Sequence, residues 1–166
     1  MQPDLMAISQ ADQQSDLGKV LVIGGCGFLG HHIVDFLLNS YDCAISVIDL
    51  CTKRNRRPES DHVQYFNGDI TSIDSLLSIF SKIKPNIVIH CASPTLLDGS
   101  KQLYKKVNVE GTRCVIEACQ TSNVTALVYT SSASIVSDNV NDLINADERW
   151  PIIPANLQSE YYSETK

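Results

Sequence analysis

A glycine-rich loop near the N-terminus has the composition and spacing needed to bind a phosphate-containing ligand. The segment Gly24–Gly30 (GGCGFLG) contains a GxxGxxG pattern (Gly24, Gly27, Gly30) and a GxGxxG pattern (Gly25, Gly27, Gly30). Glycines in such a loop allow a tight turn from strand to helix, a close approach of the backbone to a pyrophosphate, and close packing of the helix on the strand. The N–H groups at the start of the following helix then face the phosphates. We therefore predict a dinucleotide-binding site.

The last residues of the sequence contain a second candidate group. Tyr162 and Lys166 are four residues apart, so a helix would place both side chains on one face. The lysine ammonium would stabilise the tyrosine phenolate, which can remove a proton from an alcohol. Tyr161 has Thr165 rather than a lysine four residues later, so it lacks this arrangement. Tyr162 and Lys166 are therefore the predicted acid–base pair.

An acidic residue at the end of the second predicted strand bears on which dinucleotide would bind. Asp49 lies nineteen residues after Gly30, a spacing at which a carboxylate accepts hydrogen bonds from the adenosine ribose hydroxyls. This carboxylate would repel a 2′-phosphate, which favours NAD over NADP. NADP stays open as the alternative, because the residues that follow could neutralise a phosphate: Lys53, Arg54, Arg56 and Arg57. A solvated basic loop is the simpler interpretation of this cluster.

Short apolar runs alternate with longer amphipathic ones, as strands alternate with helices. Continuous apolar runs predict five buried strands: Lys19–Ile23, Ala44–Ile48, His62–Phe66, Asn86–His90 and Val124–Tyr129. Apolar residues at helical spacing predict three helices: Phe28–Asn39, Thr71–Lys84 and Lys101–Ser122. The segment Cys51–Asp61 is typical of a loop or a frayed helix. The chain becomes irregular beyond Ser137, and a further helix is expected to begin near Ser159.

This order of elements predicts the fold class. Alternating strands and helices joined by right-handed crossovers give a parallel sheet covered on both faces. We therefore expect an α/β fold with a doubly wound parallel sheet of the Rossmann type, with five strands. Residues 18–166 would form one NAD(P)-binding domain. Residues 1–17 are expected to be a flexible N-terminal tail, since its first sixteen residues are polar, acidic and free of Lys or Arg.

The composition excludes several classes of protein. The 166 residues carry a net charge of -6, which argues against binding to nucleic acid or to an anionic membrane surface. The sequence has no apolar run long enough to span a bilayer and no signal peptide, so we expect an intracellular protein. The six cysteines form no CxxC pair and the four histidines have no ligand spacing. Reduced thiols and the absence of a metal site are therefore expected.

Several further segments resemble the motifs of the extended short-chain dehydrogenase/reductase superfamily. Gly68-Asp69-Ile70 follows the third strand, where the superfamily places an aspartate against the adenine amino group. His90-Cys91-Ala92-Ser93 ends the fourth strand, and Val107–Thr112 resembles the NVxGT helix motif. Tyr129–Ser134 resembles the serine motif after the fifth strand, and Tyr162–Lys166 matches YxxxK. Together these motifs cover residues 19–166 in the order typical of the superfamily.

The resemblance implies roles for individual residues. Tyr162 would take the proton of a substrate alcohol as hydride leaves for nicotinamide, and Ser132 would hydrogen-bond the same substrate oxygen, with Ser131 as the runner-up. Lys166 would also hold the nicotinamide ribose, and Asn108 would help to position a proton-relay water. Taken without the resemblance, Asn108 could satisfy backbone groups and the serines could end a strand. The residues implied at the cofactor are Gly24, Gly25, Gly27, Phe28, Leu29, Gly30, Asp49, Asp69, Ile70, Cys91, Ala92, Ser93 and Lys166.

Within the superfamily, the sequence is most similar to the 3β-hydroxysteroid dehydrogenase group, and specifically to the sterol-4α-carboxylate 3-dehydrogenases (decarboxylating). The similarity is carried by Val20–Gly30, by Val128–Ser134 and by Ile144–Glu148 with Pro151 ahead of YSETK. Ser137-Asp138-Asn139 departs from the glycine-containing turn usual after the serine motif. The resemblance implies NAD(P)-dependent oxidation of a sterol 3β-hydroxyl to a ketone. The neighbouring carboxylate then belongs to a β-keto acid and leaves as carbon dioxide.

Other functions stay open at this point. The substrate could be another sterol-like or terpenoid alcohol, or the chain could be a sugar-nucleotide epimerase or dehydratase of the same fold. A truncated nucleotide-binding protein without turnover is the third option.

Extended members of the superfamily continue well past the YxxxK helix. We therefore expect a chain truncated after Lys166, with the substrate domain absent, a frayed last helix and an apolar face of the sheet exposed. The resemblance allows a homodimer of the full-length form and places any membrane contact in the missing region. It suggests a location in the cytoplasm or at the surface of the endoplasmic reticulum.

Overall fold

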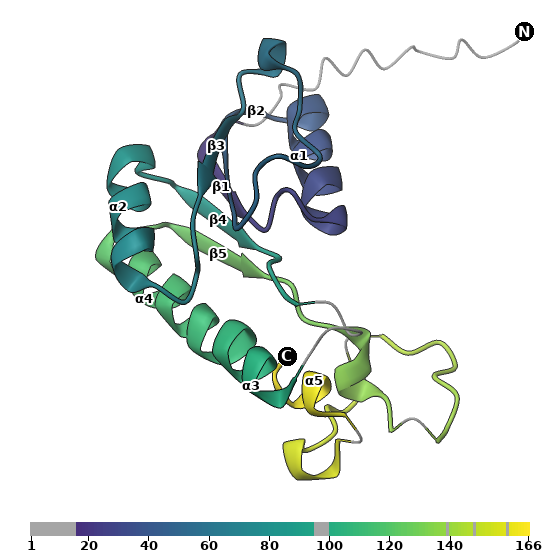
Figure 1. Ribbon diagram of the computed structural model, residues 1–166. Coiled ribbons are helices and arrows are strands. Elements are labelled where there is room, and N and C mark those ends of the chain that lie inside the picture. Colours follow the sequence, from purple (N-terminus) through teal and green to yellow (C-terminus); the bar gives the residue numbers. More distant parts are fainter. Residues whose placement is uncertain (1–15, 95–99, 139, 148, 159) are drawn as a thin grey trace, which may run out of the picture.

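A five-stranded parallel sheet forms the centre of the computed structural model, which describes residues 16–94, 100–138, 140–147, 149–158 and 160–166 (Figure 1). The strand order is β3-β2-β1-β4-β5. The strands are β1 (Asp16–Ile23), β2 (Asp42–Asp49), β3 (Gln64–Asn67), β4 (Ile87–His90) and β5 (Ala126–Tyr129). The order reverses between β1 and β4, as in a doubly wound sheet. The predicted fold class is confirmed.

All five strands begin one to three residues away from the predicted positions, and the differences at β1 and β3 have a clear local cause. β1 starts at Asp16, so Asp16 and Leu17 belong to the sheet and not to the tail. A carboxylate oxygen of Asp16 accepts the N–H of Gly18 (2.7 Å), and Gly18 has a φ of 67°, which makes a bulge that apolar periodicity does not predict. β3 starts at Gln64 because His62, with a φ of 54°, ends a short 3-10 helix (Glu59–Asp61). The rest of the predicted tail, residues 1–15, lies outside the described residues.

Helices cover both faces of the sheet (Figure 1). α1 (Phe28–Ser40) packs on β1 and β2 from one side. On the other side, α2 (Ile73–Ile83) packs beside α4 (Thr112–Thr121). The hydroxyl of Ser72 caps α2 by accepting the N–H of Ser75, and Lys84 ends the helix in a left-handed conformation just before Pro85. These start and stop residues agree with the predicted helix to within two residues.

The predicted long helix is interrupted in its middle. Its first turn is α3 (Lys101–Tyr104), followed by a π-helical segment, η2 (Lys105–Gly111), before α4 continues to Thr121. A Cβ atom at Gly111 would lie 2.8 Å from the side chain of Ile70, so η2 packs closely on the loop after β3. Single π-helical turns inside helices frequently mark functional sites. Hydrophobic periodicity could not reveal the widened turn, because it depends on contacts with distant residues.

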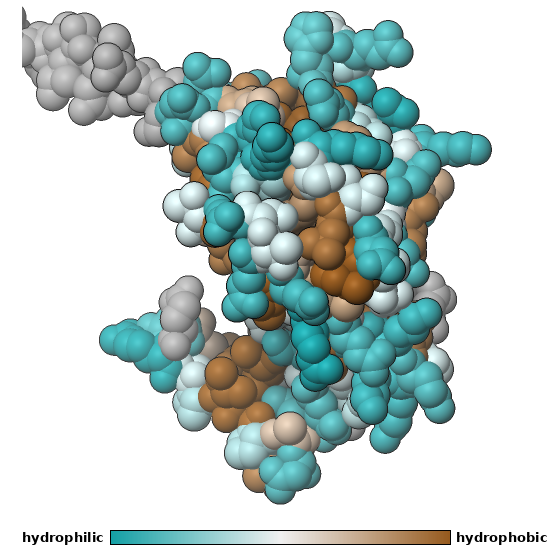
Figure 2. Space-filling view, turned by 90° about the vertical axis from the view of Figure 1, so that its left-hand side faces the viewer, coloured by the Kyte–Doolittle hydropathy of each residue, from teal (hydrophilic) through white to brown (hydrophobic). Residues whose placement is uncertain are grey.

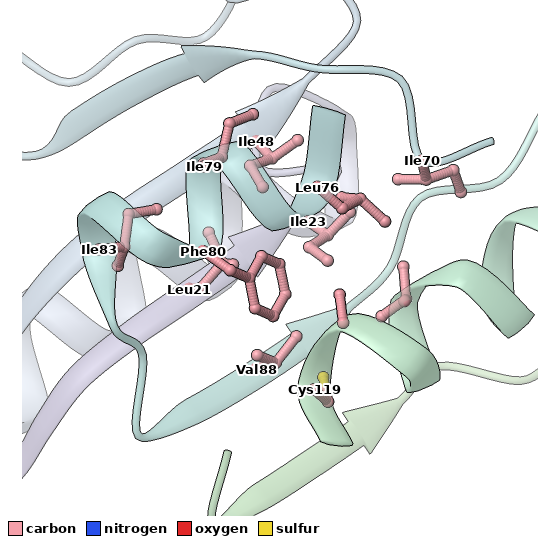
Figure 3. Close-up of a cluster of buried hydrophobic side chains, with 12 residues drawn as sticks. Leu21, Ile23, Ile48, Ile70, Leu76, Ile79, Phe80, Ile83, Val88 and Cys119 are labelled. Carbon is pink, nitrogen blue, oxygen red and sulfur yellow. The ribbon is translucent and has the colours of Figure 1, made fainter. Parts of the chain in front are cut away.

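Two hydrophobic clusters hold the layers together. Between the sheet and α2/α4, Phe80 and Leu76 point from α2 towards β1 and β4, as Figure 3 shows. On the other face, Val34 and Leu37 of α1 pack against β1 and β2. Strand β1, at the centre of the sheet, is completely buried at residues 20–23, which explains its continuous apolar sequence.

The described residues after β5 form short helices and irregular structure. The helices are η3 (Ala133–Val136), η4 (Ala155–Leu157) and α5 (Tyr161–Glu164). The predicted helix start at Ser159, and Glu148 of the motif ahead of it, lie outside the described residues. Val128 of β5 is 53% exposed, so this end of the sheet is open on one face. Among the described residues, no helix is both long and apolar enough to cross a membrane.

Candidate functional site

A cleft of about 560 Å³ lies at the carboxyl ends of the central strands. It sits where the strand order reverses, between β1 and β4, which is where open α/β sheets bind their ligands. All but two of the residues predicted at the cofactor line it. The exceptions are Gly25, whose backbone packs against Val47 of β2, and Lys166. The residues in the cleft wall are Gly24, Gly27, Phe28, Leu29, Gly30, Asp49, Asp69, Ile70, Cys91, Ala92 and Ser93.

The glycines of the loop have different structural roles. Gly24 has a φ of 85°, which makes the turn out of β1 and brings the loop against Ala92 at the end of β4. A Cβ atom at Gly30 would lie 2.1 Å from the carbonyl oxygen of Gly24, so Gly30 permits the close packing of α1. A Cβ at Gly27 would meet only that same oxygen, at 3.2 Å. Gly27 is therefore less important for packing than Gly24 or Gly30, and the position of its missing side chain is largely open space in the cleft wall.

The start of α1 is open to an anion. Its N-cap is Gly27, which makes no side-chain capping bond, and its first turn contains no acidic residue. Asp49 instead braces the loop, because its carboxylate accepts the backbone N–H groups of Cys26 (3.1 Å) and Cys51 (3.2 Å). The side chain of Asn55 adds a further link by donating to the carbonyl oxygen of Cys26 (2.9 Å). Loop and second strand thus form one cradle.

The basic cluster after β2 is divided by its contacts. Arg57 pairs with Asp35 (2.7 Å) and Asp61 (2.8 Å), and Arg56 lies over the ring of Tyr65 (4.5 Å to the centroid). Both arginines therefore stabilise the loop itself. Arg54 lines the cleft, on the same wall as Asp49. The sequence alone did not separate Arg54 from its neighbours, because their contacts come from α1 and β3.

The far wall of the cleft comes from the ends of β3 and β4. Asp69 accepts the N–H (2.9 Å) and the hydroxyl (2.8 Å) of Thr71, which helps to start α2. The thiol of Cys91 donates to the carbonyl oxygen of Ile23 (3.2 Å), and burial raises its pKa to about 11. Cys91 therefore stays a neutral thiol and serves as a packing residue.

Tyr162 and Lys166 are brought together beyond this wall. The Lys166 ammonium lies 6.0 Å from the ring centroid of Tyr162, and the Tyr162 ring packs edge-on against Tyr104 (5.5 Å between centroids). The lysine Nζ donates to the carbonyl oxygen of Thr130 (2.9 Å). Burial lowers the pKa of Lys166, and Cys91 partly opposes this shift. The helix expected to carry both residues ends earlier: α5 stops at Glu164 with Thr165 as its C-cap, so Lys166 lies just beyond the helix.

The two candidate serines differ in their contacts. Ser132 caps η3 by accepting the N–H of Ser134 (3.2 Å), and its hydroxyl also lies 2.8 Å from the Ser134 hydroxyl. Ser131 donates to the carbonyl oxygen of Lys166 (3.3 Å). Within the described part of the chain, no hydrogen bond joins Ser132 to Tyr162. The structure thus brings Ser131, the runner-up, into contact with the Tyr162–Lys166 turn.

Asn108 lies buried in the middle of η2. Its Oδ1 accepts the hydroxyl of Ser93 (3.1 Å), and its Nδ2 donates to the hydroxyl of Thr165 (3.0 Å). Sequence reasoning missed Thr165, whose only signal is its place between the two predicted catalytic residues. It also missed several apolar or small residues in the cleft wall: Leu50, Cys51, Pro94, Leu103 and Val107.

His90, at the end of β4, is a buried histidine next to this group. Its Nε2 lies 3.1 Å from the hydroxyl of Thr112, and its side chain is completely inaccessible to solvent. Burial, helped by the positive charge of Lys166, lowers its pKa from 6.5 to about 4. His90 is therefore neutral at physiological pH and acts as a structural link between β4 and α4.

This shift in the pKa of His90 predicts an acid-sensitive fold. Between pH 6.5 and about pH 4 the unfolded imidazole binds a proton and the folded one does not, so the free energy of unfolding falls as the pH falls. The full loss would be about 3 kcal/mol from this group. Urea unfolding of the His90→Gln variant should show a flatter dependence on pH over this window than the parent. The exposed His32→Gln variant serves as control, and an equal flattening there would contradict the assignment.

Comparison with known proteins identifies the family to which the chain is similar. Residues 21–166 match the 3-beta hydroxysteroid dehydrogenase/isomerase family. A sterol-4-alpha-carboxylate 3-dehydrogenase (decarboxylating) from Saccharomyces cerevisiae is 40% identical over 158 residues, which are 92% of this chain and 44% of that protein. The enzyme of the same name from Homo sapiens is 36% identical over 164 residues, 99% of this chain and 41% of its own length. The chain thus spans less than half the length of these relatives.

Solved structures share the fold. The Thermus thermophilus UDP-glucose 4-epimerase in complex with NAD superposes with a TM-score of 0.73 at 29% identity, over 89% of this chain and 47% of the epimerase. A Bordetella bronchiseptica enzyme, WbmG, in complex with NAD, gives a TM-score of 0.75 at 21% identity. The second likeness concerns the fold alone.

Proposed function

The chain belongs to the 3-beta hydroxysteroid dehydrogenase/isomerase family, and on that basis we propose that it carries the cofactor site and the acid–base residues of an NAD-dependent sterol dehydrogenase. The reaction is oxidation of the 3β-hydroxyl of a 4α-carboxysterol to a ketone, with loss of the neighbouring carboxylate as carbon dioxide. The observation that carries this proposal is the meeting of Tyr162 and Lys166 beside a cleft walled by the glycine loop and Asp49.

The cleft fits NAD. The backbone of Gly24–Gly30 would hold the pyrophosphate against the open N-terminus of α1, at a place where a Cβ on Gly27 would project. Asp49 would accept the ribose hydroxyls, and Asp69 with Ile70 would lie at the adenine. Cys91, Ala92 and Ser93 would line the nicotinamide end. When bound there, NAD supplies the hydride acceptor of the reaction.

NAD is favoured over NADP by the position of Asp49. Its carboxylate lies in the cleft wall and would face a 2′-phosphate with a like charge. Arg54 is the member of the basic cluster that also lines the cleft, and it would partly offset this repulsion. We therefore expect NADP to be used, but less well than NAD.

The residues around Tyr162 would control the proton. The tyrosine oxygen removes the hydroxyl proton of the substrate, and the nearby Lys166 ammonium stabilises the charge that the phenolate carries. Lys166 also holds the nicotinamide ribose. Ser132 would hydrogen-bond the substrate oxygen in place of its present contact with the Ser134 hydroxyl, and Ser131, which bonds the backbone of Lys166, is the alternative. Asn108 keeps the turn in place and would help to order a relay water.

A sterol-like alcohol is the substrate class that the relatives support, since the yeast and human proteins are named for such a substrate. The segment after β5 also exposes large apolar side chains: Val140, Leu143, Ile144, Ile152 and Leu157. The residues after β5 lie at the lower end of the molecule in Figure 1, and Figure 2 shows hydrophobic surface at that end. A sugar-nucleotide substrate is less favoured, because the epimerase is only 29% identical. We further propose that the full-length form is a homodimer and that any contact with a membrane is made by the part of the protein beyond this chain. The site of action would be the cytoplasm or the surface of the endoplasmic reticulum.

The proposed activity can be tested with a carboxyl-labelled 4α-carboxysterol. The protein as the cell makes it should form NADH and release labelled carbon dioxide in equal amounts, faster with NAD than with NADP. NADH without labelled carbon dioxide would mean that a hydroxyl not adjacent to the carboxylate is oxidised, because a β-keto acid loses its carboxylate, and it would contradict the proposed reaction. Conversion of UDP-glucose in place of the sterol would overturn the proposal.

A further inference from the structure

A chain of side-chain hydrogen bonds runs from the end of β4 to the backbone of Tyr162. The Ser93 hydroxyl donates to Oδ1 of Asn108 (3.1 Å) and shares its hydrogen with the carbonyl oxygen of Pro94 (3.2 Å). Nδ2 of Asn108 donates to the Thr165 hydroxyl (3.0 Å), which in turn donates to the carbonyl oxygen of Tyr162 (2.8 Å). Three segments far apart in the sequence therefore meet through two hydroxyl groups and one amide.

The direction of each bond in this chain is fixed. The Thr165 hydroxyl has one hydrogen, which it gives to the Tyr162 carbonyl, so it can only accept from Asn108. Asn108 must then turn its NH₂ group to Thr165 and its oxygen to Ser93. Neither a carboxylate nor an apolar side chain can replace the amide without leaving a partner unsatisfied.

The central bond of this chain, from Asn108 to Thr165, is also shielded from water. Asn108 is 4% exposed and Thr165 is 8% exposed. A buried donor or acceptor that loses its partner is penalised by its full desolvation, so this link resists breaking. The π-helical segment η2 makes it possible, because it places the Asn108 amide in the interior and level with Thr165.

The position of Thr165 gives the link a consequence for the reacting groups. It lies between Tyr162 and Lys166 in the sequence, and its backbone N–H also bonds the Tyr162 carbonyl (3.0 Å). Ser93 lines the cleft at the other end of the chain of bonds. The Tyr162 backbone is thereby held at a set distance from the cleft wall.

We propose that Thr165 is a positioning residue, whose hydroxyl couples Asn108 to the Tyr162–Lys166 turn and so fixes the tyrosine relative to the cleft. The inference rests on the proposed function for its effect on turnover, but the link itself is a property of the fold. Thr165 does not touch the reacting atoms and acts through Tyr162 and Lys166.

The test compares Thr165→Val, which replaces the hydroxyl with a methyl group of similar size, with Thr165→Ser, which keeps the hydroxyl. Thr165→Val should lower kcat about 10- to 100-fold, because displacing a catalytic group by about 1 Å slows a reaction by this much. KM and the affinity for NAD should change little. Thr165→Ser should restore most of kcat. Thr125→Val, which makes the same replacement at an exposed threonine just before β5, is the matched control and should behave as the parent.

A second measurement separates this proposal from the proposed function. Hydrogen–deuterium exchange of the peptide that covers residues 160–166 should be faster in Thr165→Val and unchanged in Thr165→Ser, whether or not a sterol is turned over. Unchanged exchange in Thr165→Val, or a Thr165→Ser variant as slow in turnover as Thr165→Val, would overturn the positioning role. If Thr165→Val fails to fold, Asn108→Asp breaks the same bond from the other side, and exchange at the parent rate in that variant counts equally against it.

Discussion

Replacing Tyr162 with phenylalanine should reduce oxidation of the sterol about 10²- to 10⁴-fold, the usual contribution of a general acid–base group. The substitution removes one oxygen atom and keeps the ring that packs against Tyr104. The fold and the affinity for NAD should therefore stay nearly intact, because Tyr162 does not line the cleft. Initial rates with the carboxysterol and calorimetric titration with NAD measure the two effects separately.

Tyr161 provides the matched control for this experiment. It is adjacent in sequence, and its ring lies under the ammonium of Lys101 (5.3 Å), an interaction that phenylalanine preserves. Tyr161→Phe should turn over the substrate at nearly the parent rate. Equal losses in the two variants, or loss of NAD binding by Tyr162→Phe, would rule out the proton-transfer role.

Replacing Gly30 with alanine should have the largest effect on the fold. The new Cβ would lie 2.1 Å from the carbonyl oxygen of Gly24 and 2.6 Å from the Cα of Gly25. Both neighbours are backbone atoms, so the clash can be relieved only by moving α1 away from β1. We expect a loss of about 3 kcal/mol or more, at or above the usual range for overpacking, and weaker binding of NAD as a consequence. Urea unfolding followed by circular dichroism gives the change in stability.

Substitution of Gly27 distinguishes the effect of a glycine on packing from its effect on ligand binding. A Cβ at this position meets only one atom, at 3.2 Å, so Gly27→Ala should unfold at nearly the parent urea concentration. The methyl group would occupy the side of the loop where the pyrophosphate approaches, and NAD affinity should fall steeply. A Gly30→Ala variant as stable as the parent, or a Gly27→Ala variant that binds NAD normally, would contradict these assignments.

The layout of the sheet was predictable because its signals are local. Val20–Ile23 is fully buried between two helical layers, and such a strand must be apolar at every position. The glycine loop and Asp49 follow strands directly, so their place at one edge of a parallel sheet follows from the strand order. The predicted cofactor residues from four strand ends accordingly lie around one cleft.

Other features of the site have no local signal. The regular helix predicted over Lys101–Ser122 contains a π-helical segment. In this segment Asn108 bonds Thr165 and Gly111 packs closely against Ile70, and both contacts are with residues outside the helix. The serine motif predicts Ser132 as the partner of the substrate oxygen, with Ser131 as the runner-up, and the structure adds that the Ser131 hydroxyl bonds the backbone of Lys166. Which of two adjacent hydroxyls faces a distant turn depends on the path of the chain after β5.

The sequence by itself determined the fold class, the glycine loop, the family and the pairing of Tyr162 with Lys166, because each follows from short local patterns and from their order along the chain. The tertiary structure decided which arginine reaches the cleft. It also decided that the Asn108 side chain bonds Ser93 and Thr165, and so joins the cleft wall to the Tyr162–Lys166 turn. The Asn108–Thr165 bond joins residues 57 positions apart, and the Ser93–Asn108 bond joins residues 15 apart. Such bonds form only after the strands and helices have packed, because packing alone brings these donors and acceptors within reach and excludes the water that would otherwise satisfy them.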